Sequence, residues 1–123
     1  MLFNIIKINN NIRIKLLKNN KLLGESSSQI HSDKINSSLN NIYINNNFKH
    51  NGYGSKLLNK TESILKELKI EKVYMTVWSP DTDDSLCSFY EKNNYKLTTN
   101  QPVINKIDNY DNIYLLYNMY KKL

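Results

Sequence analysis

Residues 42–58 read IYINNNFKHNGYGSKLL and hold two of the three glycines in this 123-residue chain. The apolar start predicts the end of a strand, and the leucine pair at 57 and 58 belongs to an amphipathic helix. Gly52 and Gly54 let the backbone between them turn its N–H groups inward, and a helix N-terminus adds about half a positive charge. The segment therefore predicts an anion site, although it lacks both the three-glycine Rossmann pattern and the Gly-Lys-Ser/Thr ending of a nucleotide-binding loop.

Hydrophobic periodicity predicts the elements on both sides of this segment. The helix over 56–70 has apolar residues on one stripe (Leu57, Leu58, Ile64, Leu65 and Leu68) and charged residues opposite, Glu62 among them. The sequence further predicts an apolar first segment at 2–8, strands at 12–17, 22–29, 39–44, 72–78, 95–98 and 112–120, a tight turn at 18–21, a polar loop at 31–38, and a short helix around 86–90 that ends in a left-handed cap at 93–94. The order βββ(β)αβαββ predicts a single α+β domain over 1–123.

Composition excludes several classes of protein. The longest apolar runs are far too short to span a bilayer, and the first residues lack the pattern of a secretory signal. One cysteine, Cys87, excludes an internal disulfide framework and favours a reducing, cytoplasmic location. The net charge of +6 suits an anionic partner, but the basic residues are spread over the chain without a cluster.

Two motifs resemble the signatures of the GNAT superfamily of N-acetyltransferases. The strand, the Lys49-x-x-Gly52-x-Gly54 loop and the Leu-Leu helix are similar to the family's acetyl-CoA motif, with lysine where arginine or glutamine is usual. FYEKNNY at 89–95 is similar to the second signature, with Asn94 at the glycine place, and the ending at 117–123 resembles the closing strand. The resemblance implies a GNAT-like mixed, mostly antiparallel central sheet with helices packed on it. The usual helices between the first two strands are missing, because 9–11 leave no room for them.

The resemblance also implies a mechanism. The pantetheine arm of acetyl-CoA would lie along the strand at 42–44, and the pyrophosphate would sit on the N–H groups of 50–55. Tyr90 would protonate the departing thiolate, and a backbone N–H of the strand would hold the oxyanion while an amine attacks directly. The catalytic residue implied is Tyr90; the cofactor-binding residues implied are Ile42, Tyr43, Ile44, Lys49, His50, Asn51, Gly52, Tyr53, Gly54, Ser55, Asp83 and Lys92.

Some relatives carry a glutamate base on the fourth strand, but the strand at 39–44 contains no carboxylate. Asp81, Asp83 and Asp84 are candidates for that role, and a helix-capping role for them is the alternative. The missing base leaves open a module that binds CoA without catalysis, and the charge leaves open a nucleic-acid-binding domain. The acceptor would be a primary amine of a small molecule or a protein. The missing helices should expose apolar sheet surface or a strand edge, so a homodimer is expected.

Overall fold

The computed structural model describes residues 1–80, 85–98, 104–107, 109–110 and 113–123. The chain divides into two compact units, residues 1–73 with Leu123, and residues 74–122. Among the described helices, none is long and apolar enough to cross a membrane.

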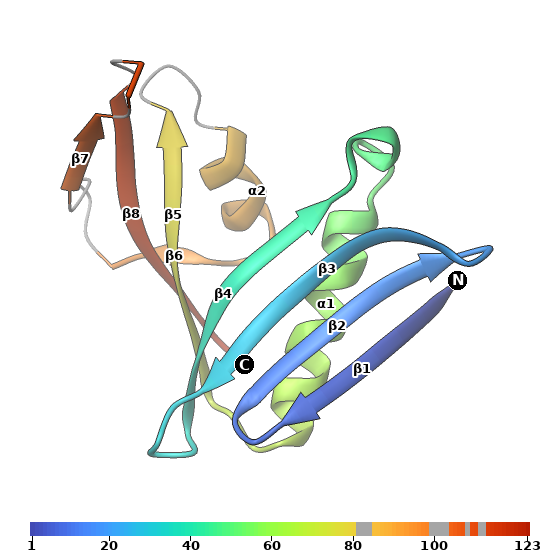
Figure 1. Cartoon of the computed structure of the whole chain (residues 1–123). Helices are drawn as coiled ribbons and strands as arrows, with labels where there is room; N and C mark the ends of the chain where they lie inside the picture. Colours follow the sequence, from blue (N-terminus) through green and yellow to red (C-terminus); the bar gives the residue numbers. More distant parts are fainter. Residues whose placement is uncertain (81–84, 99–103, 108, 111–112) are drawn as a thin grey trace. The chain divides into compact units, whose positions relative to one another are not determined.

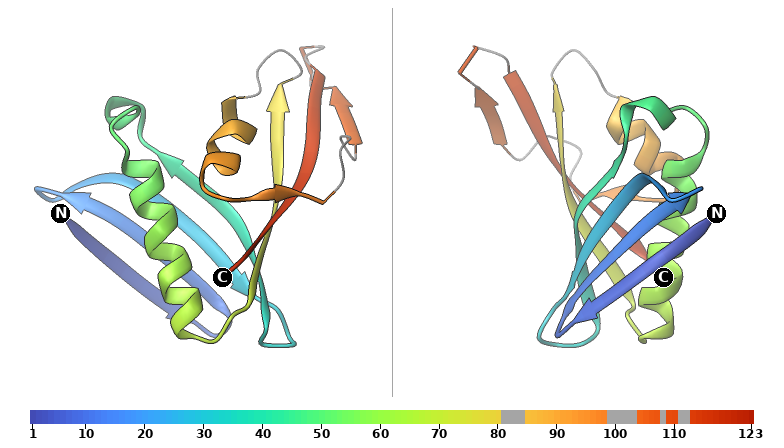
Figure 2. Two further views of the ribbon diagram at one scale, coloured as in Figure 1. Left: turned by 180° about the vertical axis from the view of Figure 1, so that it is seen from behind. Right: turned by 45° about the vertical axis from the view of Figure 1, so that its right-hand side comes forward.

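The first unit contains four antiparallel strands in the order β1-β2-β3-β4, with helix α1 along one face (Figures 1 and 2). Strand β1 joins β2 through a two-residue turn at 9–10, which confirms that no helix separates them. Asn19 and Asn20 both have left-handed φ, 52° and 63°, as the predicted turn at 18–21 requires. The elements are β1 (Leu2–Ile8), β2 (Asn11–Lys18), β3 (Lys21–Ile30), β4 (Asn36–Ile44) and α1 (Tyr53–Glu67).

The core of this unit lies between the sheet and α1. The β2 side chains of Ile14 and Leu16 and the α1 side chains of Leu57, Leu58 and Leu65 are 0% exposed. These residues confirm the predicted stripe. Two side-chain assignments on the same helix, and both of its predicted ends, are wrong.

Leu68, assigned to the apolar stripe, is 38% exposed, and Glu62, assigned to the polar face, is 9% exposed. The helix begins three residues earlier than predicted and ends at Glu67 instead of residue 70. Lys69 adopts a left-handed φ of 68°, and the N–H of Ile70 donates to the Leu65 carbonyl at 3.0 Å. This is a Schellman end, which leaves Leu68 beyond the last regular turn.

The polar loop predicted at 31–38 is shorter than expected, because β4 already begins at Asn36. The Asp33 carboxylate accepts the N–H groups of Ile35 and Asn36 at 2.9 and 3.0 Å, which confines the turn to 31–35. Ser37 is then fully buried on the strand. Polarity alone suggested a loop, but a small hydroxyl side chain fits a strand interior.

An irregularity separates the two halves of the β3–β4 pairing. Ser27 pairs with Asn41 while Ser28 pairs with Leu39, so Asn40 is an extra residue on β4. Beyond this bulge, Gly24 lies opposite Ile44, and a Cβ on Gly24 would overlap the carbonyl oxygen of Tyr43. Glycine is therefore needed here so that β3 and β4 can approach closely.

The second unit is built around β8, which pairs antiparallel with β6 and β7 and neighbours β5. Tilted aromatic pairs join β5 to β8, with ring centroids 6.4 Å apart for Tyr74 and Tyr120 and 6.5 Å apart for Trp78 and Tyr114. Three strands close the chain, where the sequence predicted two. The elements are β5 (Lys72–Pro80), which begins in the first unit, α2 (Ser85–Lys92), β6 (Lys96–Leu97), β7 (Ile104–Ile107) and β8 (Ile113–Lys122).

The end of α2 confirms the predicted left-handed cap. Asn94 has a φ of 72°, and the N–H of Tyr95 donates to the Tyr90 carbonyl at 3.0 Å. The N–H of Asn94 donates to the Glu91 carbonyl at the same distance. Asparagine can thus take the place that glycine usually holds in a Schellman end.

Candidate functional site

The segment between β4 and α1 turns sharply before the helix begins. A single 3-10 turn, η1 (Asn46–Phe48), is followed by two left-handed residues, His50 with φ 67° and Gly52 with φ 78°. Gly52 is the N-cap of α1. The sequence assigned the special backbone conformations to both glycines, but Gly54 lies inside α1 and is not left-handed. His50 supplies the second left-handed residue instead.

Asparagine side chains hold this turn in place. Asn45 anchors the end of β4 to β3, because its N–H donates to the Leu23 carbonyl at 2.8 Å and its Nδ2 to the Leu22 carbonyl at 2.5 Å. The Nδ2 of Asn51 lies 3.2 Å from the carbonyl oxygens of both Phe48 and Lys49. These contacts use backbone carbonyls and leave the amides at the start of α1 for another partner.

The N-terminus of α1 has the features of an anion site. Gly52 offers no side-chain cap, and the first turn contains no acidic residue. Lys49 and Lys56 are exposed on either side of it in the chain. A Cβ placed on Gly52 would meet no atom within 4 Å, so space is open at this point. Free helix amides, nearby lysines and open space fit a phosphate-bearing group.

Strand β4 leads directly into this turn. The side chains of Ile42 and Ile44 are half-buried, while Tyr43 between them is 38% exposed. The structure therefore brings the predicted pantetheine strand at 42–44 and the predicted pyrophosphate loop at 49–55 into the same unit.

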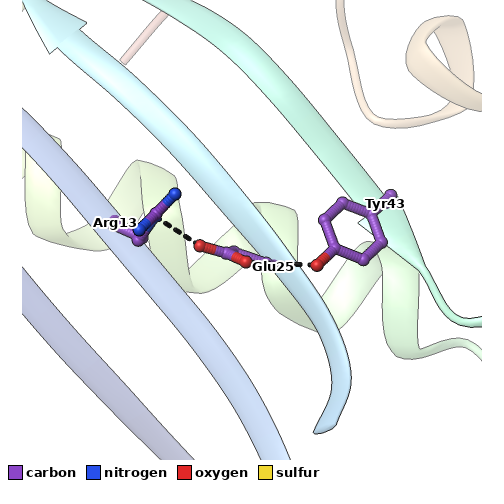
Figure 3. Close-up of polar contacts among 3 residues, drawn as sticks. All are labelled: Arg13, Glu25 and Tyr43. Atoms are coloured by element: carbon purple, nitrogen blue, oxygen red, sulfur yellow. Dashed lines mark hydrogen bonds and ion pairs between the residues drawn. The ribbon is translucent and has the colours of Figure 1, made fainter.

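Tyr43 belongs to a polar cluster that the sequence did not predict (Figure 3). Its hydroxyl donates to Oε2 of Glu25 on β3 at 3.1 Å, and Nε of Arg13 on β2 lies 2.5 Å from Oε1 of Glu25. Desolvation, followed by the hydrogen bond to Glu25, raises the pKa of Tyr43 above its usual value. The sequence feature that could have indicated this cluster is a glutamate within the strand at 22–29. Residues near Glu25 in sequence do not identify Arg13 and Tyr43 as its partners.

Tyr90 and Lys92 lie on α2 in the second unit, where Lys92 is exposed at the end of the helix. Tyr90 is buried, with its ring centroid 5.1 Å from that of Phe89 and 5.8 Å from that of Tyr95 in edge-on contacts. Burial raises the pKa of Tyr90 to about 12.

Asp81, Asp83 and Asp84 lie outside the described residues, so the cofactor contact expected for Asp83 is untested. Among the described residues, no group of three His, Cys, Asp or Glu side chains could hold a metal ion.

Comparison with known sequences finds that the sequence model of the acetyltransferase (GNAT) family matches residues 6–95. No curated protein matches the sequence significantly.

Solved structures share the fold at low sequence identity. The chain is similar to the PaiA N-acetyltransferase of Thermoplasma acidophilum in complex with coenzyme A, with 20% identity, a TM-score of 0.69, and coverage of 93% of this chain and 62% of that chain. It is similar to a GNAT family acetyltransferase of Elizabethkingia anophelis with acetyl-CoA bound, with 15% identity, a TM-score of 0.75, and coverage of 93% and 77%. It is also similar to the ribosomal-protein-S18-alanine N-acetyltransferase of Escherichia coli, with 15% identity, a TM-score of 0.76, and coverage of 94% of this chain and 71% of that chain. The chain thus spans less than two thirds of the first of these proteins and about three quarters of the other two.

Proposed function

The chain belongs to the GNAT acetyltransferase family, and from this premise we propose that it transfers the acetyl group of acetyl-CoA to a primary amine. The observation that carries the proposal is the uncapped N-terminus of α1, which follows the left-handed residues His50 and Gly52. A diphosphate would receive hydrogen bonds from the free amides of this turn and charge stabilisation from Lys49.

Acetyl-CoA would supply the activated thioester, and the chain would bind and orient it. The backbone of residues 42–44 would hold the pantetheine arm, and the amides of 50–55 would hold the pyrophosphate. Asn45 and Asn51 fix the ends of this segment through hydrogen bonds to backbone carbonyls. A site that is already ordered loses less conformational entropy when the ligand binds.

Tyr90 is the proposed proton donor for the departing thiolate. Its hydroxyl is protonated at neutral pH, as a donor must be. A pKa of about 12 nevertheless makes it a weaker acid than a thiol with a pKa of about 8.5. Proton transfer from Tyr90 to the thiolate is therefore unfavourable, and the alternative is that the thiolate leaves ionised and takes its proton from bulk solvent.

A second candidate function is binding of CoA without catalysis. It is favoured by the absence of carboxylates from β4, all of whose residues are described, and by the raised pKa of Tyr90. Both functions share the same cofactor site and differ only in turnover.

Two measurements test the proposal. Acetyl-CoA in excess over its dissociation constant should raise the melting temperature, because a ligand that binds only the folded state stabilises it. Free thiol should then appear when the protein is mixed with acetyl-CoA and primary amines. No thermal shift at millimolar acetyl-CoA would overturn the proposal, and a shift without thiol release would favour the non-catalytic function.

We further propose that two copies pair through strand β1. This strand is at the edge of the first unit, and Leu2, Ile6 and Ile8 are 64%, 38% and 64% exposed. Strand β1 contains no proline, its pairing with β2 has no bulge, and Lys7 is its one charged residue, so most of the edge is open to a further strand. A second antiparallel β1 would pair with the free edge and cover these side chains around a two-fold axis.

The lone cysteine favours a reducing compartment, and we propose a cytoplasmic location.

A further inference from the structure

The two faces of the first unit differ in their access to solvent. On the α1 face, Ile12, Ile14 and Leu16 of β2 are packed under the helix and are at most 1% exposed. On the opposite face, the side chains of Arg13 and Glu25 are 61% and 13% exposed. Within this unit, the face opposite α1 is therefore the face of the sheet that the helix leaves open to an acceptor.

Glu25 is the one carboxylate on strands β1–β4, all of whose residues are described. It pairs in register with Tyr43, the middle residue of the segment 42–44 whose backbone is proposed to hold the pantetheine arm. The edge of β4 that faces β3 is already paired, so an arm held by the β4 backbone would lie on its other edge, two strand spacings or about 10 Å from the Glu25 backbone. The Glu25 side chain extends toward β4 and reaches the Tyr43 hydroxyl.

The cluster keeps the Glu25 carboxylate oriented on this face (Figure 3). Tyr43 and Arg13 contact one oxygen each, at 3.1 and 2.5 Å. Oε1 is buried, so a further donor would have to reach Oε2, which has an acceptor position left beside the Tyr43 hydroxyl.

We propose that Glu25 is the acceptor-binding residue: it receives the ammonium group of the acceptor and takes its proton as the amine attacks. This role rests on the proposed acetyltransferase function. The bound ammonium first loses one proton through a Glu25 oxygen to water, which leaves a neutral amine that can attack. The new C–N bond then forms as the C–S bond breaks, the second proton moves from nitrogen to the Glu25 oxygen and then to water, and the thiolate is protonated by Tyr90 or water. Strand β3 thereby supplies the carboxylate that β4 lacks.

Glu25→Gln is the variant that tests this role. The glutamine carbonyl can accept from Arg13 Nε while its amide donates to the Tyr43 hydroxyl, so the cluster and the fold should persist. Three amines serve as probes: n-butylamine, lysine amide, and a tetrapeptide with a free N-terminus. We expect kcat/KM for the amine that reacts best to fall about 100-fold, within the range of acid–base catalysis. Titration of that amine into the CoA complex should show at least tenfold weaker binding. The thermal shift with acetyl-CoA should not change.

Glu67→Gln is the matched control, because it removes one carboxylate from the exposed end of α1. It should leave amine binding and turnover unchanged. Glu25→Asp keeps the charge and should restore part of the amine binding lost in Glu25→Gln, and it replaces that variant if the glutamine protein does not fold.

The outcomes separate the two proposals. No binding of acetyl-CoA by the unaltered protein would overturn the proposed function. Acetyl-CoA binding without reaction or binding of any probe amine would count against Glu25 as an ammonium site. Turnover that survives Glu25→Gln, with only a lower melting temperature, would show that the cluster is structural and would overturn this inference alone.

Discussion

The hydroxyl of Thr61 on α1 lies 2.7 Å from the hydroxyl of Ser26 on β3, and both groups are buried. Thr61 Oγ1 also donates to the carbonyl oxygen of Leu57, 2.8 Å away. A hydroxyl has a single hydrogen to donate, so Ser26 is the donor to Thr61. This relay connects α1 to the strand that also carries Glu25, although the two hydroxyls are 35 residues apart in sequence.

Thr61→Val should lower the free energy of unfolding by about 1–3 kcal/mol, because valine keeps the shape but leaves the buried Ser26 hydroxyl without an acceptor. Urea denaturation measures this change. Ser26→Ala added to Thr61→Val should cost less than the sum of the two single changes, since the double variant leaves no buried donor. Strictly additive effects would contradict the relay.

Local patterns predicted most of the fold. Alternation at 12–16 and the stripe at 57–65 depend only on neighbours in sequence, and both elements are present, although α1 begins and ends earlier than predicted. The wrong element ends occur where a backbone conformation or a contact with residues distant in sequence sets the boundary. The left-handed Lys69 ended α1 early, and burial of Ser37 extended β4 into a polar segment.

The candidate site was predictable only in part. The glycine-containing turn before α1 follows from residues close in sequence, and Gly52 has the left-handed backbone that such a turn needs. The cluster around Glu25 joins three strands, so its members are adjacent only after β2, β3 and β4 have paired. The residues next to Glu25 in sequence therefore do not predict its contacts with Arg13 and Tyr43.

Gly54→Val should abolish the thermal shift with acetyl-CoA and leave the melting temperature of the free protein nearly unchanged. Gly54 lies in the first turn of α1 without a left-handed backbone, where valine is tolerated at least as well as glycine. Its side chain would occupy space beside amides that are proposed to meet the pyrophosphate. Differential scanning fluorimetry with and without acetyl-CoA measures both quantities.

Gly52→Ala tests the same turn from its other side. Its left-handed φ of 78° strains any Cβ, at about 1 kcal/mol, and the Cβ would enter the open space proposed for the pyrophosphate. This variant should melt earlier and lose part of its response to acetyl-CoA. If the Gly54→Val protein bound acetyl-CoA normally, the proposal that the pyrophosphate binds at the N-terminus of α1 would be wrong.

Ile6→Lys should convert the proposed β1-paired dimer to a monomer, because it places a charge at the centre of an interface with a two-fold axis. Light scattering at tens of micromolar protein measures the molecular mass. Ile35→Lys is the matched control, since Ile35 is 45% exposed in the turn before β4. If the unaltered protein is a monomer, no second copy covers β1. If it is a dimer that Ile6→Lys does not disrupt, the dimer forms through another surface.

The raised pKa of Tyr90 predicts a loss of stability at high pH. An unfolded tyrosine ionises near pH 10, whereas burial holds the folded Tyr90 neutral until about pH 12. Between these values the unfolded state has released a proton that the folded state retains, so the free energy of unfolding falls as pH rises. Two pKa units correspond to about 2–3 kcal/mol. Denaturation of Tyr90→Phe beside the unaltered protein should show a shallower decline over pH 10–12, and equal slopes would contradict the burial effect.

Tyr90→Phe should lower kcat about tenfold and leave the KM for acetyl-CoA nearly unchanged. Tenfold is low for general acid catalysis, because a hydroxyl with a pKa of about 12 donates poorly to a thiolate and water replaces part of its contribution. A fall in kcat alone would mark an interaction made mainly in the transition state. Tyr95→Phe, whose ring packs edge-on against Tyr90, is the matched control and should keep kcat.

The competing interpretation is that Tyr90 serves packing, since its ring contacts Phe89 and Tyr95 and its carbonyl accepts the N–H that ends α2. Under that interpretation phenylalanine keeps every one of these contacts. Unchanged kcat with a good acceptor would therefore assign the proton to water and leave Tyr90 as a core residue of the second unit.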